Sequence, residues 1–130
     1  KAFSVNIPSE DLIRATDYCG VVSGAKEDKA ALFTLFYGSL PNAPMIEECP
    51  VCMECQLVDI YEVKGYDVFI GEIVETHVRE DALTEGRVDL AKVRPLMFDM
   101  SSRKYWGLKP EPVGDCWRIG VDYKKELRGK

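Results

Sequence analysis

Apolar and polar positions alternate along two long segments in the middle of the chain. Val, Ile, Tyr and Phe are frequent in residues 51–61 and 67–78, and such residues favour strands whose side chains point alternately to two faces. Lys64-Gly65 lies between the segments, and glycine adopts the positive φ of a tight turn without penalty. The pattern predicts an antiparallel hairpin in which residues 51–61 pair with residues 67–78.

The alternation also predicts which face each side chain of the first strand occupies. The odd positions are apolar and suit a core: Cys49, Val51, Met53, Cys55, Leu57 and Tyr61. The even positions begin with Cys52, Glu54 and Gln56, which predicts a wetter face, and continue with the apolar Val58 and Ile60. On this prediction Cys19 and Cys55 only pack, and Cys52 is the more reactive thiol.

A metal site is the alternative interpretation of the three cysteines. Cys49, Cys52 and Cys55 have the Cys-x2-Cys-x2-Cys spacing of iron–sulfur loops,. A strand, however, directs Cys52 away from the other two sulfurs, and a fourth ligand would have to come from Cys19 or Cys116, both distant in sequence. We therefore expect neither a cluster nor a structural zinc, and we interpret His77 as a surface or core residue.

Proline, glycine and helix-capping residues divide the rest of the chain. The expected elements are a strand over residues 3–7, a helix from Ser9 to Gly20, a second helix from Asp28 to Tyr37, a loop to the hairpin, a polar connection over 79–92 with a helical turn at 90–93, a strand over 95–100, a loop around 105–110 and a last strand or ordered tail over 115–121,. Antiparallel strands with inserted helices favour a small mainly β barrel over a parallel sheet.

Composition fits one domain spanning residues 1–130. The chain is 46% hydrophobic and carries a net charge of −5, which disfavours nucleic acid or an anionic membrane as a partner. No apolar run approaches the roughly 20 residues that span a bilayer. Five cysteines without the density of a secreted scaffold suggest reduced thiols and a cytoplasmic location,. Because the first residues are already strand-like, we expect a domain that lacks an N-terminal part; replacement of the initiator Met by tag residues is the alternative.

Several short segments, taken in order, resemble the flavin reductase-like family and especially its flavoredoxin branch. They are Phe3-Ser-Val-Asn-Ile-Pro8, Thr16-Asp-Tyr-Cys-Gly20, Val22-Ser-Gly24 with Asp28-Lys29, Ala43-Pro-Met-Ile-Glu-Glu-Cys-Pro50, Glu54-Cys55 and Phe69-Ile-Gly-Glu-Ile-Val74. The resemblance implies an antiparallel Greek-key split β-barrel that binds FMN, and a homodimer with the flavin near the subunit interface. It also implies electron transfer from NAD(P)H, or exchange of electrons with a redox protein partner. Many relatives carry a His just after the glycine of the hairpin turn, where this chain has Tyr66-Asp67.

Four residues are candidates for holding the flavin. The resemblance places a basic residue, Lys29, near the FMN phosphate, where a helix N-terminus and the Ser23 hydroxyl would add donors; a solvated lysine and a turn serine are the alternatives. The Asn6 amide could pair with the flavin ring edge, or form a cross-strand bond. Tyr105, with Trp106, could stack on the ring, or fill a small core under its loop.

Hydride chemistry of this kind belongs to the cofactor, which agrees with a chain that has one His and no G-x-S-x-G or G-x-G-x-x-G motif,. We expect no catalytic side chain. Two other classes stay open: a non-enzymatic, flavoredoxin-type electron carrier, and a truncated barrel that dimerises without binding flavin.

Overall fold

A three-stranded antiparallel sheet organises the chain in the computed structural model, which describes residues 1–129. Its strands lie in the order β1 (Ala2–Ile7), β4 (Val51–Val63) and β5 (Tyr66–Val78). β4 and β5 form the predicted hairpin, and Lys64 and Gly65 turn it with φ of 50° and 82°. The central hairpin and the N-terminal strand predicted from the sequence are confirmed.

Two irregularities interrupt the pairing of β4 with β5. The register shifts between Glu54 and Cys55 and again between Leu57 and Asp59, as β-bulges do. Before the first shift, at the start of β4, Cys52 pairs with His77. After the second shift, next to the turn, Tyr61 pairs with Val68. We call residues 51–55 with 75–78 the hairpin base, and residues 58–70 the hairpin tip.

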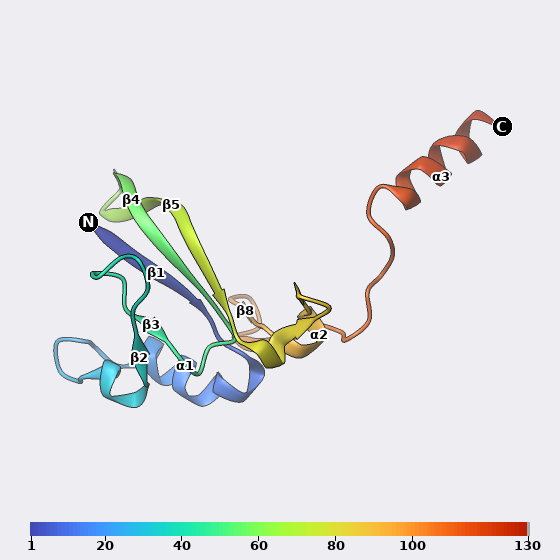
Figure 1. The fold of residues 1–130 in the computed structure, drawn as a ribbon. Helices are drawn as coiled ribbons and strands as arrows, with labels where there is room; N and C mark the ends of the chain where they lie inside the picture. Colours follow the sequence, from blue (N-terminus) through green and yellow to red (C-terminus); the bar gives the residue numbers. More distant parts are fainter. Residues whose placement is uncertain (130) are drawn as a thin grey trace.

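Smaller elements surround the base of this sheet (Figure 1). Three two-stranded ladders pair β2 with β3, β6 with β7, and β8 with β9, all antiparallel. Their strands are β2 (Leu35–Phe36), β3 (Met45–Ile46), β6 (Leu83–Thr84), β7 (Arg87–Val88), β8 (Leu96–Asp99) and β9 (Lys104–Gly107). The helices are α1 (Ile13–Val21), α2 (Leu90–Val93) and α3 (Arg118–Arg128), with 3-10 turns η1 (Glu10–Leu12), η2 (Lys29–Leu32) and η3 (Glu80–Ala82). The mainly β, antiparallel architecture with inserted helices is the one predicted.

Several local predictions are wrong. The helix expected from Asp28 to Tyr37 is a four-residue 3-10 turn, capped by the Asp28 side chain at the Ala30 N–H, because residues 35–36 instead pair with residues 45–46. The loop expected around 105–110 begins as strand β9. Residues 115–121, expected to be a last strand or an ordered tail, include no strand and run into helix α3 from Arg118, and Gly20 lies within α1 instead of ending it.

The hairpin base is covered on both faces, and this corrects the predicted exposure of β4. Cys52 and Glu54, assigned to a wet face, are 1% and 0% exposed. The β2–β3 ladder covers that side, where Cys52 joins Met45 and Cys49 in a core cluster. Cys55 is also buried, on the opposite face beside Phe3. Alternation alone missed a strand that is buried on both sides.

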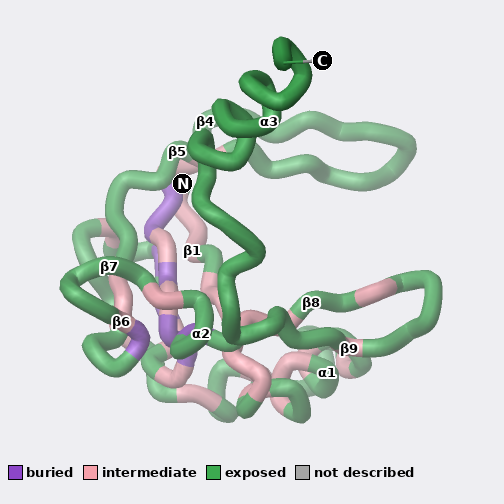
Figure 2. Tube along the Cα trace, turned by 90° about the vertical axis from the view of Figure 1, so that its right-hand side faces the viewer, coloured by how far each residue is buried: buried purple, intermediate pink, exposed green. Residues whose placement is uncertain are grey.

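Burial ends where the hairpin leaves this base (Figure 2). Every residue from Val58 to Ile70 is exposed, and so is every residue from Trp106 to Gly129. Within residues 1–129, no helix combines the length and apolar character needed to cross a bilayer.

Candidate functional site

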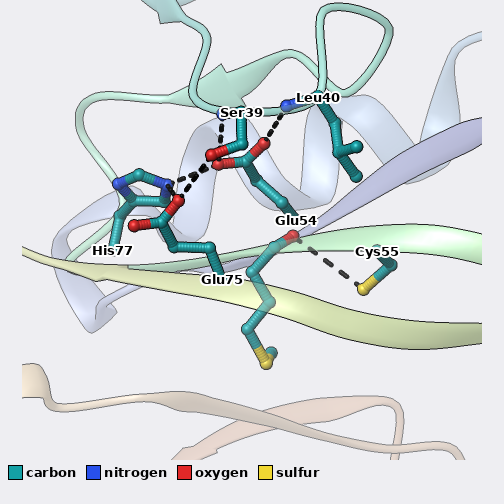
Figure 3. Close-up of polar contacts among 7 residues, drawn as sticks. Ser39, Leu40, Glu54, Cys55, Glu75 and His77 are labelled. Atoms are coloured by element: carbon teal, nitrogen blue, oxygen red, sulfur yellow. Dashed lines mark hydrogen bonds and ion pairs between the residues drawn. The ribbon is translucent and has the colours of Figure 1, made fainter.

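A buried carboxylate anchors the loop that covers the hairpin base (Figure 3). Glu54 accepts hydrogen bonds from the backbone N–H groups of Ser39 (3.1 Å) and Leu40 (2.6 Å), and its Oε1 lies 2.6 Å from Nε2 of His77. The Ser39 hydroxyl donates to Glu75 at 2.9 Å. Since a carboxylate only accepts, the His77 Nε2 carries the proton of this bond.

These bonds favour the charged form of Glu54. The N–H of Leu40 and then His77 lower the pKa of its carboxyl, burial opposes them, and the Ser39 N–H lowers the pKa further. Gly38 permits the close approach: a Cβ there would overlap the Glu54 carboxylate and come within 2.8 Å of His77 Nε2. Local sequence thus fixes a tight loop over a buried charge.

Glu54, Glu75 and His77 also form the one group among residues 1–129 with three metal-ligating atoms within 4.8 Å of one another. The carboxylate of Glu54 is already held by two backbone N–H groups and His77. In the described part of the chain, no buried side-chain nitrogen or oxygen lacks a partner. The arrangement therefore fits a structural anchor, and it carries no metal assignment.

An open hollow of about 350 Å³ lies beside His77. Phe36, Cys49, Cys52 and Arg79 contribute to its walls, and the Phe36 ring meets the His77 ring edge-on at 5.6 Å. Burial, then the neighbouring Cys52, raises the pKa of the Cys49 thiol to about 12, and burial likewise raises the pKa of Cys52. Cys52 is thus a protonated packing thiol, and the prediction that it is the reactive cysteine is wrong.

The Ser23–Lys29 loop brings two of the predicted flavin ligands together. The ammonium of Lys29 donates to the carbonyl of Cys19 at 2.6 Å, near the C-terminal end of α1, and the aliphatic chain of Lys29 lies beside Gly24. Ser23 Oγ accepts from the N–H of Ala25 at 3.3 Å. Lys29 thus begins the 3-10 turn η2, in place of the longer helix that the sequence predicted, and its ammonium lies at the C-terminal end of α1.

The other two predicted residues are each engaged elsewhere. Asn6 accepts from the Ile46 N–H at 3.0 Å and donates to Ser4 Oγ at 2.9 Å, while lining a hollow of about 170 Å³ that Cys19 also lines. Tyr105 on β9 donates to Asp17 at 3.2 Å and packs against Phe98; burial and Asp17 raise its pKa. Residues 17 and 19 lie about 200° apart around a helix, so Tyr105 and Lys29 bond to different sides of α1.

Similarity to known proteins identifies the family of this chain. The flavin reductase like domain matches residues 1–107. The chain belongs to the flavin reductase-like family. It is similar to flavoredoxin from Methanosarcina acetivorans (39% identity, TM-score 0.87, 92% of this chain and 64% of that one) and to flavoredoxin of Desulfovibrio vulgaris (35%, 0.80, 90% and 63%).

An uncharacterized protein of Archaeoglobus fulgidus is 34% identical over 68% of this chain and 50% of its own length. The chain thus spans about half of that relative and under two thirds of both flavoredoxins. These likenesses confirm the split-barrel fold and the family that the sequence motifs indicated.

Sequence reasoning missed Glu54, His77 and their loop. A charged residue among the apolar residues Val51, Cys52, Met53 and Cys55, and the only histidine of the sequence on the facing strand, were the available signals. Their proximity depends on register, which the bulge at Glu54/Cys55 sets.

Proposed function

We propose that the chain is the FMN-binding part of a flavoprotein that moves electrons between NAD(P)H or a redox protein and an acceptor. The observation that carries this is the similarity to M. acetivorans flavoredoxin over 92% of the chain at 39% identity. FMN would supply the hydride and electron chemistry when bound, and the chain's own residues would bind and orient it.

The Ser23–Lys29 loop has the donor set that a phosphate needs. The Lys29 ammonium has three N–H groups and gives one to Cys19, which leaves two,. The Ser23 hydroxyl accepts from Ala25 and keeps its own proton to donate,. We place the phosphate here, and we place no ring contact on Asn6, whose amide is already paired.

Flavin titration of the purified chain tests the assignment of Lys29. A charge-assisted contact is worth about 1.5–3 kcal/mol, so Lys29→Ala should weaken FMN binding about tenfold to a hundredfold. Riboflavin lacks the phosphate and should lose far less. Lys26→Ala in the same loop is the matched control, and thermal melting of both variants shows whether the lost bond to Cys19 affects the fold.

Equal losses for FMN and riboflavin would show that Lys29 does not act on the phosphate. Absence of binding for both flavins would contradict the flavin proposal for this chain and favour a barrel that only dimerises.

A flavoredoxin-type electron carrier is the second candidate, favoured because both similar structures named above are flavoredoxins. Oxidation of NAD(P)H by the FMN-loaded chain alone would favour the reductase. If reduction needs an added redox protein, the carrier is favoured. For either function we propose a homodimer.

A further inference from the structure

Thr34 connects the turn that carries Lys29 to the turn that precedes β4. η2 begins at Lys29, and Thr34 lies just beyond its end, immediately before β2. The backbone N–H of Thr34 donates to both carboxylate oxygens of Glu48, at 2.9 Å and 3.2 Å. The carbonyl of Thr34 accepts from the N–H of Glu47 at 2.9 Å. Both backbone groups of Thr34 are therefore held by one short turn.

This second turn is itself fixed to the hairpin base. Pro50 is buried, and its carbonyl accepts from the backbone N–H of Arg79, next to the end of β5, at 3.0 Å. The guanidinium of Arg79 donates to the carbonyl of Glu48 at 3.0 Å. Glu48 is thus bonded through its backbone to the hairpin base and through its side chain to Thr34.

The carboxylate of Glu48 is charged at neutral pH. Burial raises the pKa of this carboxyl, but the N–H groups of Thr34 and of Glu48 itself outweigh burial and lower the pKa below its ordinary value of 4.5. A hydrogen bond from a backbone N–H to a charged carboxylate is stronger than one to a neutral acceptor. The bond between Glu48 and Thr34 is therefore a charge-assisted one.

The other backbone bonds of η2 are local. The Asp28 side chain accepts from the N–H of Ala30 at 3.1 Å, and the carbonyl of Ala30 accepts from the N–H of Phe33 at 3.1 Å. These bonds join neighbouring residues, so they set the shape of the turn that carries Lys29 but not its position relative to the sheet. The bonds of Thr34 extend the β2–β3 ladder to the end of η2, and they set that position.

We infer that Glu48 is a positioning residue for the FMN phosphate, because its carboxylate holds in place the turn that carries Lys29. The inference rests on the proposed function, in which Lys29 binds that phosphate. Glu48 acts through Lys29 and need not touch the flavin. An anionic side chain would by itself repel a phosphate, so its positioning role and its charge predict opposite effects when it is removed.

Flavin titration of Glu48→Ala shows which effect dominates. Loss of positioning should weaken FMN binding about threefold to tenfold, since a group that must be ordered on binding reduces affinity. Riboflavin, which has no phosphate, should change little. Glu48→Gln removes the charge but keeps an oxygen that can accept from Thr34, so it should bind FMN at least as well as the parent chain. Tighter FMN binding by Glu48→Ala would overturn the inference, because the carboxylate would then act only through its charge.

Glu47→Ala is the matched control. It removes the same charge from the neighbouring, exposed side chain and keeps the N–H that donates to Thr34, so FMN binding should not weaken. The double variant Lys29→Ala/Glu48→Ala separates positioning from a general effect on the fold. It should bind FMN no more weakly than Lys29→Ala alone, because the phosphate contact is already lost. Additive losses, or equal losses of FMN and riboflavin in Glu48→Ala, would overturn the inference and leave the assignment of Lys29 standing.

Hydrogen exchange of the chain without flavin gives a readout that does not depend on the proposed function. Glu48→Ala should speed exchange of the N–H groups of Ala30, Phe33 and Thr34, whereas Glu48→Gln and Glu47→Ala should not. Unchanged exchange in this turn would overturn the inference, even where Lys29→Ala discriminates FMN from riboflavin. Equal losses of both flavins in Lys29→Ala would contradict the proposed phosphate site, and the inference would fall with it.

Discussion

The two ends of the β4–β5 hairpin have the same backbone pairing in opposite surroundings. At the base, the loop with Ser39 and Leu40 covers one face, where a charged group, Glu54, is fully buried, and Cys55 is buried on the other face. At the tip, residues 58–70 are exposed on both faces although many are apolar. The strands thus stay paired at the tip although they are not buried there. The chemistry of each end of the hairpin depends on the residues that cover it.

The two ends of the hairpin also differ in the environment of their polar and apolar side chains. The base satisfies a buried carboxylate within the chain, through two backbone N–H groups and His77. The tip leaves apolar area in water, where it contributes no hydrophobic stabilisation. The base is therefore expected to determine stability, and the tip to contribute little to it.

Removing the buried carboxylate is the strongest test of this comparison. Glu54→Ala leaves two backbone N–H groups without an acceptor, and a buried unsatisfied donor is costly. We expect the melting temperature to fall by about 10 °C or more. Glu62→Ala removes an exposed carboxylate from the tip and should shift it by no more than about 2 °C. Similar falls in melting temperature for Glu54→Ala and Glu62→Ala, measured by thermal denaturation, would contradict the difference in stability between base and tip.

A pair of glycine substitutions gives a smaller contrast. Gly38→Ala places a methyl group into the Glu54 carboxylate, so the loop must move, and we expect a loss of about 5–10 °C in melting temperature. Gly65→Ala meets no neighbour within 4 Å but strains a φ of 82°, which costs about 1–2 kcal/mol locally. Because the tip is exposed and can open by itself, the global loss should be only a few degrees.

The glycine comparison fails if Gly65→Ala lowers the melting temperature as much as Gly38→Ala does. Hydrogen exchange would then be expected to show the tip and base opening together, as one cooperative unit.

The hairpin could be predicted from the sequence because its determinants are local. Alternation and the Lys64-Gly65 turn are enough to pair residues 51–61 with 67–78. The burial of Cys52 and Glu54 could not be predicted in this way, since it depends on residues outside the hairpin that cover them. A bulge also changes which residues of β4 and β5 face each other.

The wrong helix prediction has the same cause, which is pairing between segments that are not adjacent in sequence. Ala30-Ala31-Leu32 favours a helix locally, but pairing of β2 with β3 overrides it,. In α3 the four-residue recurrence of Ile119, Tyr123 and Leu127 was present in the sequence and would have indicated the helix. Of the candidate flavin residues, Lys29 and Ser23 share a loop, whereas Tyr105 contacts another side of α1.

The smallest expected difference between the two ends of the hairpin is in how pH changes the melting temperature, and we expect this effect at the base. The folded pKa of Glu54 lies below its ordinary value of 4.5, so the charged group stabilises the fold above pH 4.5, and this contribution is lost as pH falls through the folded pKa. Glu54→Gln should melt several degrees below the parent chain at pH 7, and the gap should narrow below pH 4.5. Glu62→Gln removes the same charge from the exposed tip and is the matched control. A gap for Glu54→Gln that stays constant from pH 7 to pH 3 would mean that the charge of Glu54 does not stabilise the fold, and that shape alone holds the loop over the base.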